Sequence, residues 1–171
     1  RHAGWVALFT AIAASADWVC IPEKPVEVEK MCDHLKKVHT RNKVALVVAS
    51  EAITIPGEDL GEEKLDEFGH MLLKKRGVGD RLSTLIEAKT KIETRVAVIG
   101  HIQRGGPPTL FDRILGSRVG VKAADLVAEG KFGQMVALRG NDVTGVSLEE
   151  ATSKLKIVTP EWIKFAEVFF K

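Results

Sequence analysis

The segment KVALVVAS, Lys43 to Ser50, constrains the fold of this chain more than any other stretch. Six consecutive apolar residues, Val44 to Ala49, fill its interior, and three of them are valines. A strand exposed on one face alternates apolar and polar residues, whereas a strand covered on both faces stays apolar throughout. We therefore predict a strand that is buried on both faces in a parallel sheet.

Helix-like and strand-like patterns alternate along the rest of the chain. Helices are predicted at 1–16 (buried on most faces), 26–39, from about 78 to 91, 109–130, 149–156 and 160–170. Further strands are predicted at 18–23, 94–100, 134–140 and 142–147, with a long surface loop over 51–66. This alternation predicts an α/β fold, a three-layer sandwich with a largely parallel sheet.

Charge is balanced and dispersed, which argues against several classes of partner. The chain has 25 Lys and Arg against 23 Asp and Glu, for a formal net charge of +2. Because the two signs alternate along solvated helix faces, no nucleic-acid partner is expected. No apolar run approaches the ~20 residues that span a bilayer, so no membrane or targeting segment is expected either.

The cysteine pattern indicates reduced thiols. Cys20 lies in the apolar run WVCI, Cys32 lies in a predicted helix, and neither has a CxxC or CxxH neighbour. This pattern favours buried free thiols over a disulfide or a metal site. It fits a reducing cytoplasm.

The segment GHIQRGGPPTLFDR, Gly100 to Arg113, is the best candidate for a binding site. It follows the strand predicted at 94–100, and ligands of open α/β sheets bind beyond the carboxyl ends of the strands. Arg95, His101 and Arg104 supply three possible cationic donors there, and the planar guanidinium suits phosphate oxygens. An anion site is therefore one interpretation of this segment.

The glycines and the following helix start support the same interpretation. Gly105 and Gly106 allow close backbone approach or a positive φ. Thr109 and Asp112 have the spacing of a capping box, and the first amides of a helix attract anions. The alternative is an ordinary loop in which Arg104 and Asp112 form a surface ion pair.

Three other residues are ambiguous from sequence alone. Glu51 ends the Lys43–Ser50 strand, where its carboxylate could accept sugar hydroxyls, hold a metal ion or be a solvated charge. Arg1 is the first residue and carries no local signal. Asp17 could cap a strand or a helix. Together with the cationic donors, these residues point to an anionic, hydroxylated ligand. No P-loop, GxGxxG, HExxH or GxSxG motif occurs, so the sequence shows no obvious catalytic base.

Three separated motifs resemble the phosphofructokinase family. ETR at Glu93–Arg95 with GHIQRGGPPTLFDR resembles the family's ETRxxxLGHxQRGGxPxxxDR, RHAGWVALFTAIA resembles MGRHxGxxAL, and VALVVASEA resembles IVVxAEGA. The resemblance implies part of a two-lobed phosphofructokinase fold. It also implies a cytoplasmic, glycolytic phosphotransferase that moves a phosphoryl group from ATP or pyrophosphate, with Mg²⁺, to the 1-hydroxyl of fructose 6-phosphate.

The resemblance also assigns residues. Arg1, His101 and Arg104 match contacts of the sugar phosphate, and Glu51 matches the carboxylate that holds sugar hydroxyls. Arg95 matches an arginine that reaches the substrate of a neighbouring subunit, which implies a homodimer or homotetramer. The family's catalytic base and nucleotide loops lie upstream of the segment matched by Arg1, so the chain alone is expected to be inactive.

The same resemblance divides the chain and marks departures. It implies a sugar-phosphate lobe over 1–103, a segment crossing back to the nucleotide lobe over 104–150 and carboxy-terminal helices over 151–171. Asp17 matches an acidic effector position of the family. However, Ala14 and Ser15 replace the glycines that precede this position, and RNKV replaces GKKH, so ordinary bacterial effector binding is not expected.

The alternative function is a noncatalytic sugar-phosphate-binding or regulatory module. In a further alternative, the arginines serve only a subunit interface.

Overall fold

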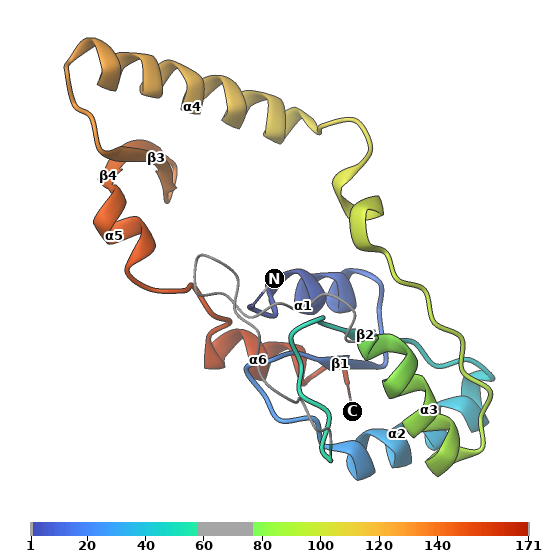
Figure 1. The fold of residues 1–171 in the computed structure, drawn as a ribbon. Coiled ribbons are helices and arrows are strands. Elements are labelled where there is room, and N and C mark those ends of the chain that lie inside the picture. Colours follow the sequence, from blue (N-terminus) through green and yellow to red (C-terminus); the bar gives the residue numbers. More distant parts are fainter. Residues whose placement is uncertain (1, 58–76, 171) are drawn as a thin grey trace. The chain divides into compact units, whose positions relative to one another are not determined.

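The structure is a computed structural model that describes residues 2–57 and 77–170 (Figure 1). The chain divides into two compact units. Unit 1 consists of residues Arg1–Val98 and Lys156–Lys171, and unit 2 of residues Ile99–Leu155. Part of the loop predicted over 51–66 lies outside the described residues. None of the helices in the described ranges is long and apolar enough to cross a membrane.

Unit 1 is built on two short parallel strands. β1 (Trp18–Cys20) pairs with β2 (Val47–Ala49), with Trp18 opposite Val47 and Cys20 opposite Ala49. The helices of the unit are α1 (Trp5–Ala13), α2 (Val28–Asn42), α3 (Val78–Thr90) and α6 (Pro160–Ala166). The parallel pairing predicted for the Lys43–Ser50 segment is confirmed.

Each face of this small sheet contacts its own hydrophobic core. Trp18, Cys20 and Val47 pack into a core whose other members come mainly from α2 and α3. Val19 and Val48 pack into a second core formed with α1 and α6. Successive strand residues point to opposite faces, so the alternation places helices on both sides. Unit 1 is thus a three-layer α/β arrangement, as predicted.

The two cysteines are free and buried, which confirms the sequence prediction. Both belong to the core shared by α2 and α3. Burial raises the pKa of the Cys20 thiol to about 12 and also raises the pKa of Cys32. Because the thiolate is the nucleophile, these thiols are unreactive packing groups.

Three sequence predictions are wrong in detail. The strand predicted over Lys43–Ser50 is reduced to Val47–Ala49, and Val44 is 71% exposed. Residues 94–100 form no strand: their backbone joins no ladder in the part of the chain that the structure describes, and Val98 is 79% exposed. A strand requires a paired neighbour, which the apolar pattern alone does not supply. The helix predicted at 1–16 buries only one face, because Val6 and Phe9 are exposed.

Unit 2 contains a long helix and a hairpin. A 3₁₀ turn at Gly100–Arg104 precedes α4 (Leu110–Ala128), which is followed by β3 (Gln134–Arg139), β4 (Asp142–Ser147) and α5 (Leu148–Thr152). β3 and β4 pair in antiparallel register. Gly130 has a φ of +69° just after α4, which confirms it as the predicted stop.

The start of α1 depends on Gly4 and Glu23. The Gly4 N–H donates to both carboxylate oxygens of Glu23, at 2.9 and 3.1 Å, and the Val158 N–H donates to the same carboxylate at 3.0 Å. A Cβ on Gly4 would lie 2.5 Å from the Cβ of Ile21 and 2.6 Å from a Glu23 oxygen. Only glycine therefore allows this close approach.

We predict that Gly4→Ala lowers the free energy of unfolding by about 1–3 kcal/mol, because the added methyl group must displace Ile21 or Glu23. Gly116→Ala is the matched control, since a Cβ there meets nothing within 4 Å. In the interior of α4 the control should be neutral or stabilise by up to about 1 kcal/mol. Urea denaturation measures both variants, and equal effects would contradict the role assigned to Gly4.

Candidate functional site

Two of the predicted cationic residues share a single turn. His101 and Arg104 lie in the 3₁₀ helix Gly100–Arg104, and both side chains are exposed. In a 3₁₀ helix, side chains three residues apart are eclipsed. His101 and Arg104 therefore project from the same face of the turn, which is the arrangement that two donors to a single anion require.

The glycines after the turn act differently from each other. The Gly105 N–H donates to the Ile102 carbonyl at 3.1 Å, and Gly105 is extended, with φ −92° and ψ 179°. Gly106 has a φ of +89°, although a Cβ there would meet nothing within 4 Å. The predicted positive φ is thus confirmed for Gly106 alone, where backbone conformation and not space favours glycine.

The next helix begins with the predicted capping box. The Thr109 side chain accepts from the Asp112 N–H at 3.3 Å, and Asp112 Oδ2 accepts from the Thr109 N–H at 2.9 Å and from its hydroxyl at 2.6 Å. These bonds lower the pKa of the Asp112 carboxyl. Asp112 thus bonds Thr109, and no ion pair joins it to Arg104 in the described part of the chain, so the predicted surface pair is wrong.

The cap should be pH-dependent. Because the Asp112 pKa is lower in the folded chain, its stabilising contribution is present above the unfolded pKa and is lost as the pH falls through the folded value. The difference in Tm between wild type and Asp112→Asn should therefore shrink between about pH 6 and about pH 2. Thermal unfolding followed by circular dichroism measures it.

Thr109→Ala provides a second variant for the same test. It removes the hydroxyl that donates to Asp112, so it should lose much of the same pH-dependent contribution. A difference in Tm that stays constant with pH in both variants would show that the capping box does not set the ionisation of Asp112.

Glu51 and Arg95 belong to unit 1. Glu51 lies in the turn that follows β2 and is exposed, so it is at the carboxyl end of a parallel strand, as predicted. The Arg95 side chain is 90% exposed, and both its Nε and Nη2 donate to Glu93 Oε1 at 3.2 Å. The backbone just before Arg95 is tied to α3, because the Thr94 N–H donates to Glu87 Oε1 at 2.6 Å.

Asp17 caps a strand, one of the two structural roles considered from the sequence, through a partner that the sequence did not identify. Its Oδ2 accepts from the Leu46 N–H at 2.8 Å, and its own N–H donates to the Leu46 carbonyl at 2.8 Å. Asp17 therefore joins the residue before β1 to the residue before β2. The partners are 29 residues apart in sequence, so no local pattern reveals the bond. Arg1, the remaining predicted site residue, lies outside the described residues.

The described residues do not form a metal site. No group of three or more His, Cys, Asp or Glu side chains among them is arranged to hold an ion. The Mg²⁺ implied by the family resemblance therefore has no cluster of three such ligands in the described part of the chain.

These features define an α/β protein whose chain also carries, in unit 2, a turn with two donors suited to a phosphate. Residues 1–127 match the sequence model described as phosphofructokinase, and this match covers every candidate site residue. The chain belongs to the phosphofructokinase family.

Individual relatives agree with the family and differ in phosphoryl donor. The chain is 44% identical to a pyrophosphate–fructose 6-phosphate 1-phosphotransferase of Amycolatopsis methanolica and 43% identical to an ATP-dependent 6-phosphofructokinase of Mycobacterium leprae. Each alignment covers 99% of this chain and 50% of the relative, so the chain spans about half the length of these relatives.

A solved structure shows the same fold. The structure of phosphofructokinase from Saccharomyces cerevisiae superposes with a TM-score of 0.70 and 25% identity, over 99% of this chain and 20% of that chain. This likeness supports the α/β fold described above and the family match.

Proposed function

We propose that this chain supplies the sugar-phosphate site of a phosphofructokinase, which transfers a phosphoryl group to the 1-hydroxyl of fructose 6-phosphate. The observation that carries the proposal is the turn Gly100–Arg104, which presents His101 and Arg104 on one face within the family match. The reaction is taken from the names of the relatives. Because the chain is 44% identical to a pyrophosphate-dependent relative and 43% identical to an ATP-dependent one, both pyrophosphate and ATP are retained as candidate donors.

Each assigned residue has a chemical role in holding the sugar. His101 and Arg104 donate to the 6-phosphate, with Arg104 able to bind two phosphate oxygens at once. Arg1 adds a further cation to the same phosphate. The carboxylate of Glu51 accepts hydrogen bonds from sugar hydroxyls. Fixing the phosphate at one end and the hydroxyls at the other positions the 1-hydroxyl for in-line attack on the donor.

Arg95 is the residue that would act between subunits. Its side chain is 90% exposed, and its ion pair with Glu93 lies at the surface, where such pairs contribute little to stability. Arg95 can therefore exchange Glu93 for a phosphate of a neighbouring subunit's substrate. On this proposal the active enzyme is a homodimer or homotetramer.

The proposal also divides the chain by role. Residues 1–103 form the sugar-phosphate lobe, residues 104–150 cross back to the nucleotide-binding lobe, and residues 151–171 form the carboxy-terminal helices. The two buried free thiols are compatible with a reducing cytoplasm, where we place the enzyme.

We expect Arg104→Ala to weaken the binding of fructose 6-phosphate by about 2–5 kcal/mol, because it removes a bidentate cation from the phosphate. Calorimetry on the protein that carries this chain measures the change. Arg139→Ala is the matched control. It removes one arginine from the same unit, where Arg139 of β3 pairs with Glu150 of α5. The control should leave the affinity unchanged.

The outcomes separate the proposal from its alternatives. Unchanged affinity in Arg104→Ala would contradict the phosphate contact and favour arginines that serve only an interface. Binding that depends on Arg104 without any turnover, in the presence of Mg²⁺ with either donor, would favour the noncatalytic sugar-phosphate module.

A further inference from the structure

The segment that leaves α3 carries Arg95 and is held against that helix. The Thr94 N–H donates to Glu87 Oε1, near the end of α3, at 2.6 Å. The Cγ1 atom of Val96 lies so close to Gly79, near the start of α3, that a Cβ on this glycine would be 2.7 Å away. The segment therefore runs back beside the helix (Figure 1). Arg95 lies between two neighbours that both contact α3.

Side chains of this segment alternate between the helix and the solvent. Ile92 and Thr94 are half-buried. Glu93 and Arg95 are exposed and form an ion pair with each other. In an extended chain, successive side chains point to opposite sides. Because the neighbours of Arg95 are held on α3, the guanidinium projects from the opposite side, toward the solvent.

Glu87 holds the exit of α3 through both its main chain and its side chain. Its carbonyl accepts from the Lys91 N–H at 2.9 Å, and its carboxylate accepts from the Thr94 N–H. Lys91 has a φ of +62°, which is uncommon for a residue other than glycine, so the chain reverses sharply at this point. A carboxylate in the last turn of a helix faces the negative end of the helix dipole. Helix stability alone therefore does not favour Glu87, whereas the bond to Thr94 does.

We propose that Glu87 is the positioning residue of Arg95 for the binding of fructose 6-phosphate. By holding the Thr94 amide, its carboxylate sets where the guanidinium projects. A hydrogen bond from an amide to a charged acceptor is stronger than one between neutral groups, and a donor oriented in advance loses less entropy on binding. The inference rests on the proposed function, because that proposal assigns Arg95 to the phosphate of a neighbouring subunit's substrate.

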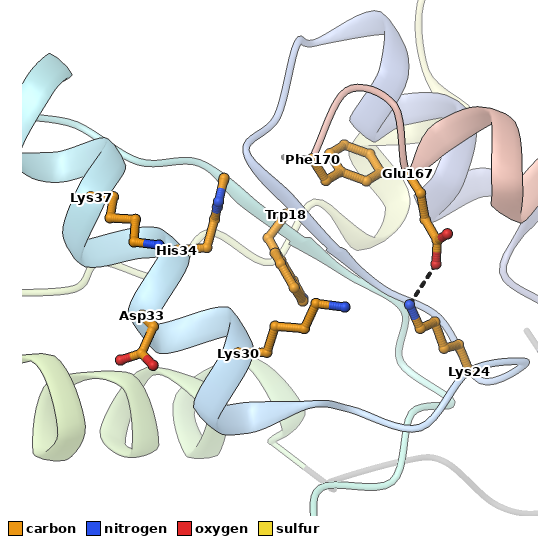
Figure 2. Close-up of a pocket in the computed structure, with 8 residues that line it drawn as sticks. All are labelled: Trp18, Lys24, Lys30, Asp33, His34, Lys37, Glu167 and Phe170. Atoms are coloured by element: carbon orange, nitrogen blue, oxygen red, sulfur yellow. Dashed lines mark hydrogen bonds and ion pairs between the residues drawn. The ribbon is translucent and has the colours of Figure 1, made fainter.

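The pocket beside α2 belongs to a different part of unit 1. Its lining residues include Trp18, Lys30, His34 and Lys37 (Figure 2). Neither Glu87 nor Arg95 lines it. A substitution of Glu87 therefore leaves the lining of this pocket as it is, and its effect on substrate binding is expected to pass through the segment that carries Arg95.

Glu87→Ala tests the inference in the full-length protein that carries this chain. It removes the acceptor of the Thr94 amide, while alanine keeps α3 helical. The KM for fructose 6-phosphate should rise about fivefold while kcat stays within about twofold, because binding of the substrate is what weakens. Glu87→Gln keeps an oxygen that can accept from Thr94, so its KM should stay within about twofold of wild type.

Glu149→Ala is the matched control for Glu87→Ala. It also replaces an exposed or half-buried helix glutamate by alanine, but in α5 of unit 2. Its KM and kcat should both stay at the wild-type values. Equal KM values in Glu87→Ala and Glu149→Ala would overturn the inference.

Arg95→Ala separates the inference from the proposed function. It should raise KM about tenfold, and adding Glu87→Ala should raise KM no further, because no guanidinium is left to position. An unchanged KM in Arg95→Ala would contradict the role of Arg95 in the proposed function and the inference with it. A raised KM in Arg95→Ala, with effects that multiply in the double variant, would overturn the inference alone.

Gly79→Ala reaches the same segment at its other contact with α3, and it serves if Glu87→Ala does not fold. The added Cβ must displace Val96, so KM should rise at least about twofold, again without a further rise beside Arg95→Ala. Gly120→Ala is its control, since a Cβ there meets nothing within 4 Å. A wild-type KM in Gly79→Ala, with folding confirmed by circular dichroism, would show that the seat on α3 does not orient Arg95.

Discussion

The carboxylate of Glu23 joins three parts of unit 1 that are distant in sequence. It accepts hydrogen bonds from the N–H of Gly4, at the start of α1, and from the N–H of Val158, before α6. Both amides are partly buried, and leaving such a donor without a partner costs about 1–3 kcal/mol. Since α1 and α6 form one of the two cores, this carboxylate fixes the layer that covers one face of the sheet.

Features set by local sequence were predictable. The spacing of Met31, Leu35 and Val38 predicts the buried face of α2, and Thr109 with Asp112 predicts where α4 begins. The turn with His101 and Arg104 belongs to the same class, because its donors and glycines lie within a few residues of one another. The strand predicted at 94–100 is wrong because a strand is not set by local sequence alone: an apolar run forms a strand only where another strand pairs with it.

The residues that sequence reasoning missed act over long distances. Asp17 bonds a backbone amide 29 residues away, and Glu23 bonds one 135 residues away. The residues around a carboxylate do not show whether it bonds a distant amide or is exposed to solvent, so neither bond could be predicted from the local sequence. Gly4 matches a glycine of the family motif, but its own conformation is ordinary, and the nearness of Ile21 and Glu23 that requires glycine is not visible in the sequence. These positions follow from tertiary packing, which a single sequence does not display.

Helix α2 links the folding of unit 1 to the pocket beside it. Met31 and Leu35 point into the core, whereas Lys30, His34 and Lys37 follow the neighbouring stripe of the same helix and line the pocket. Residues three and four positions apart share a helix face, so one amphipathic pattern supplies both sets. The core residues are buried hydrophobic groups, whereas Lys30 and Lys37 are exposed, so substitutions of those two lysines leave intact the packing that holds α2 against α3.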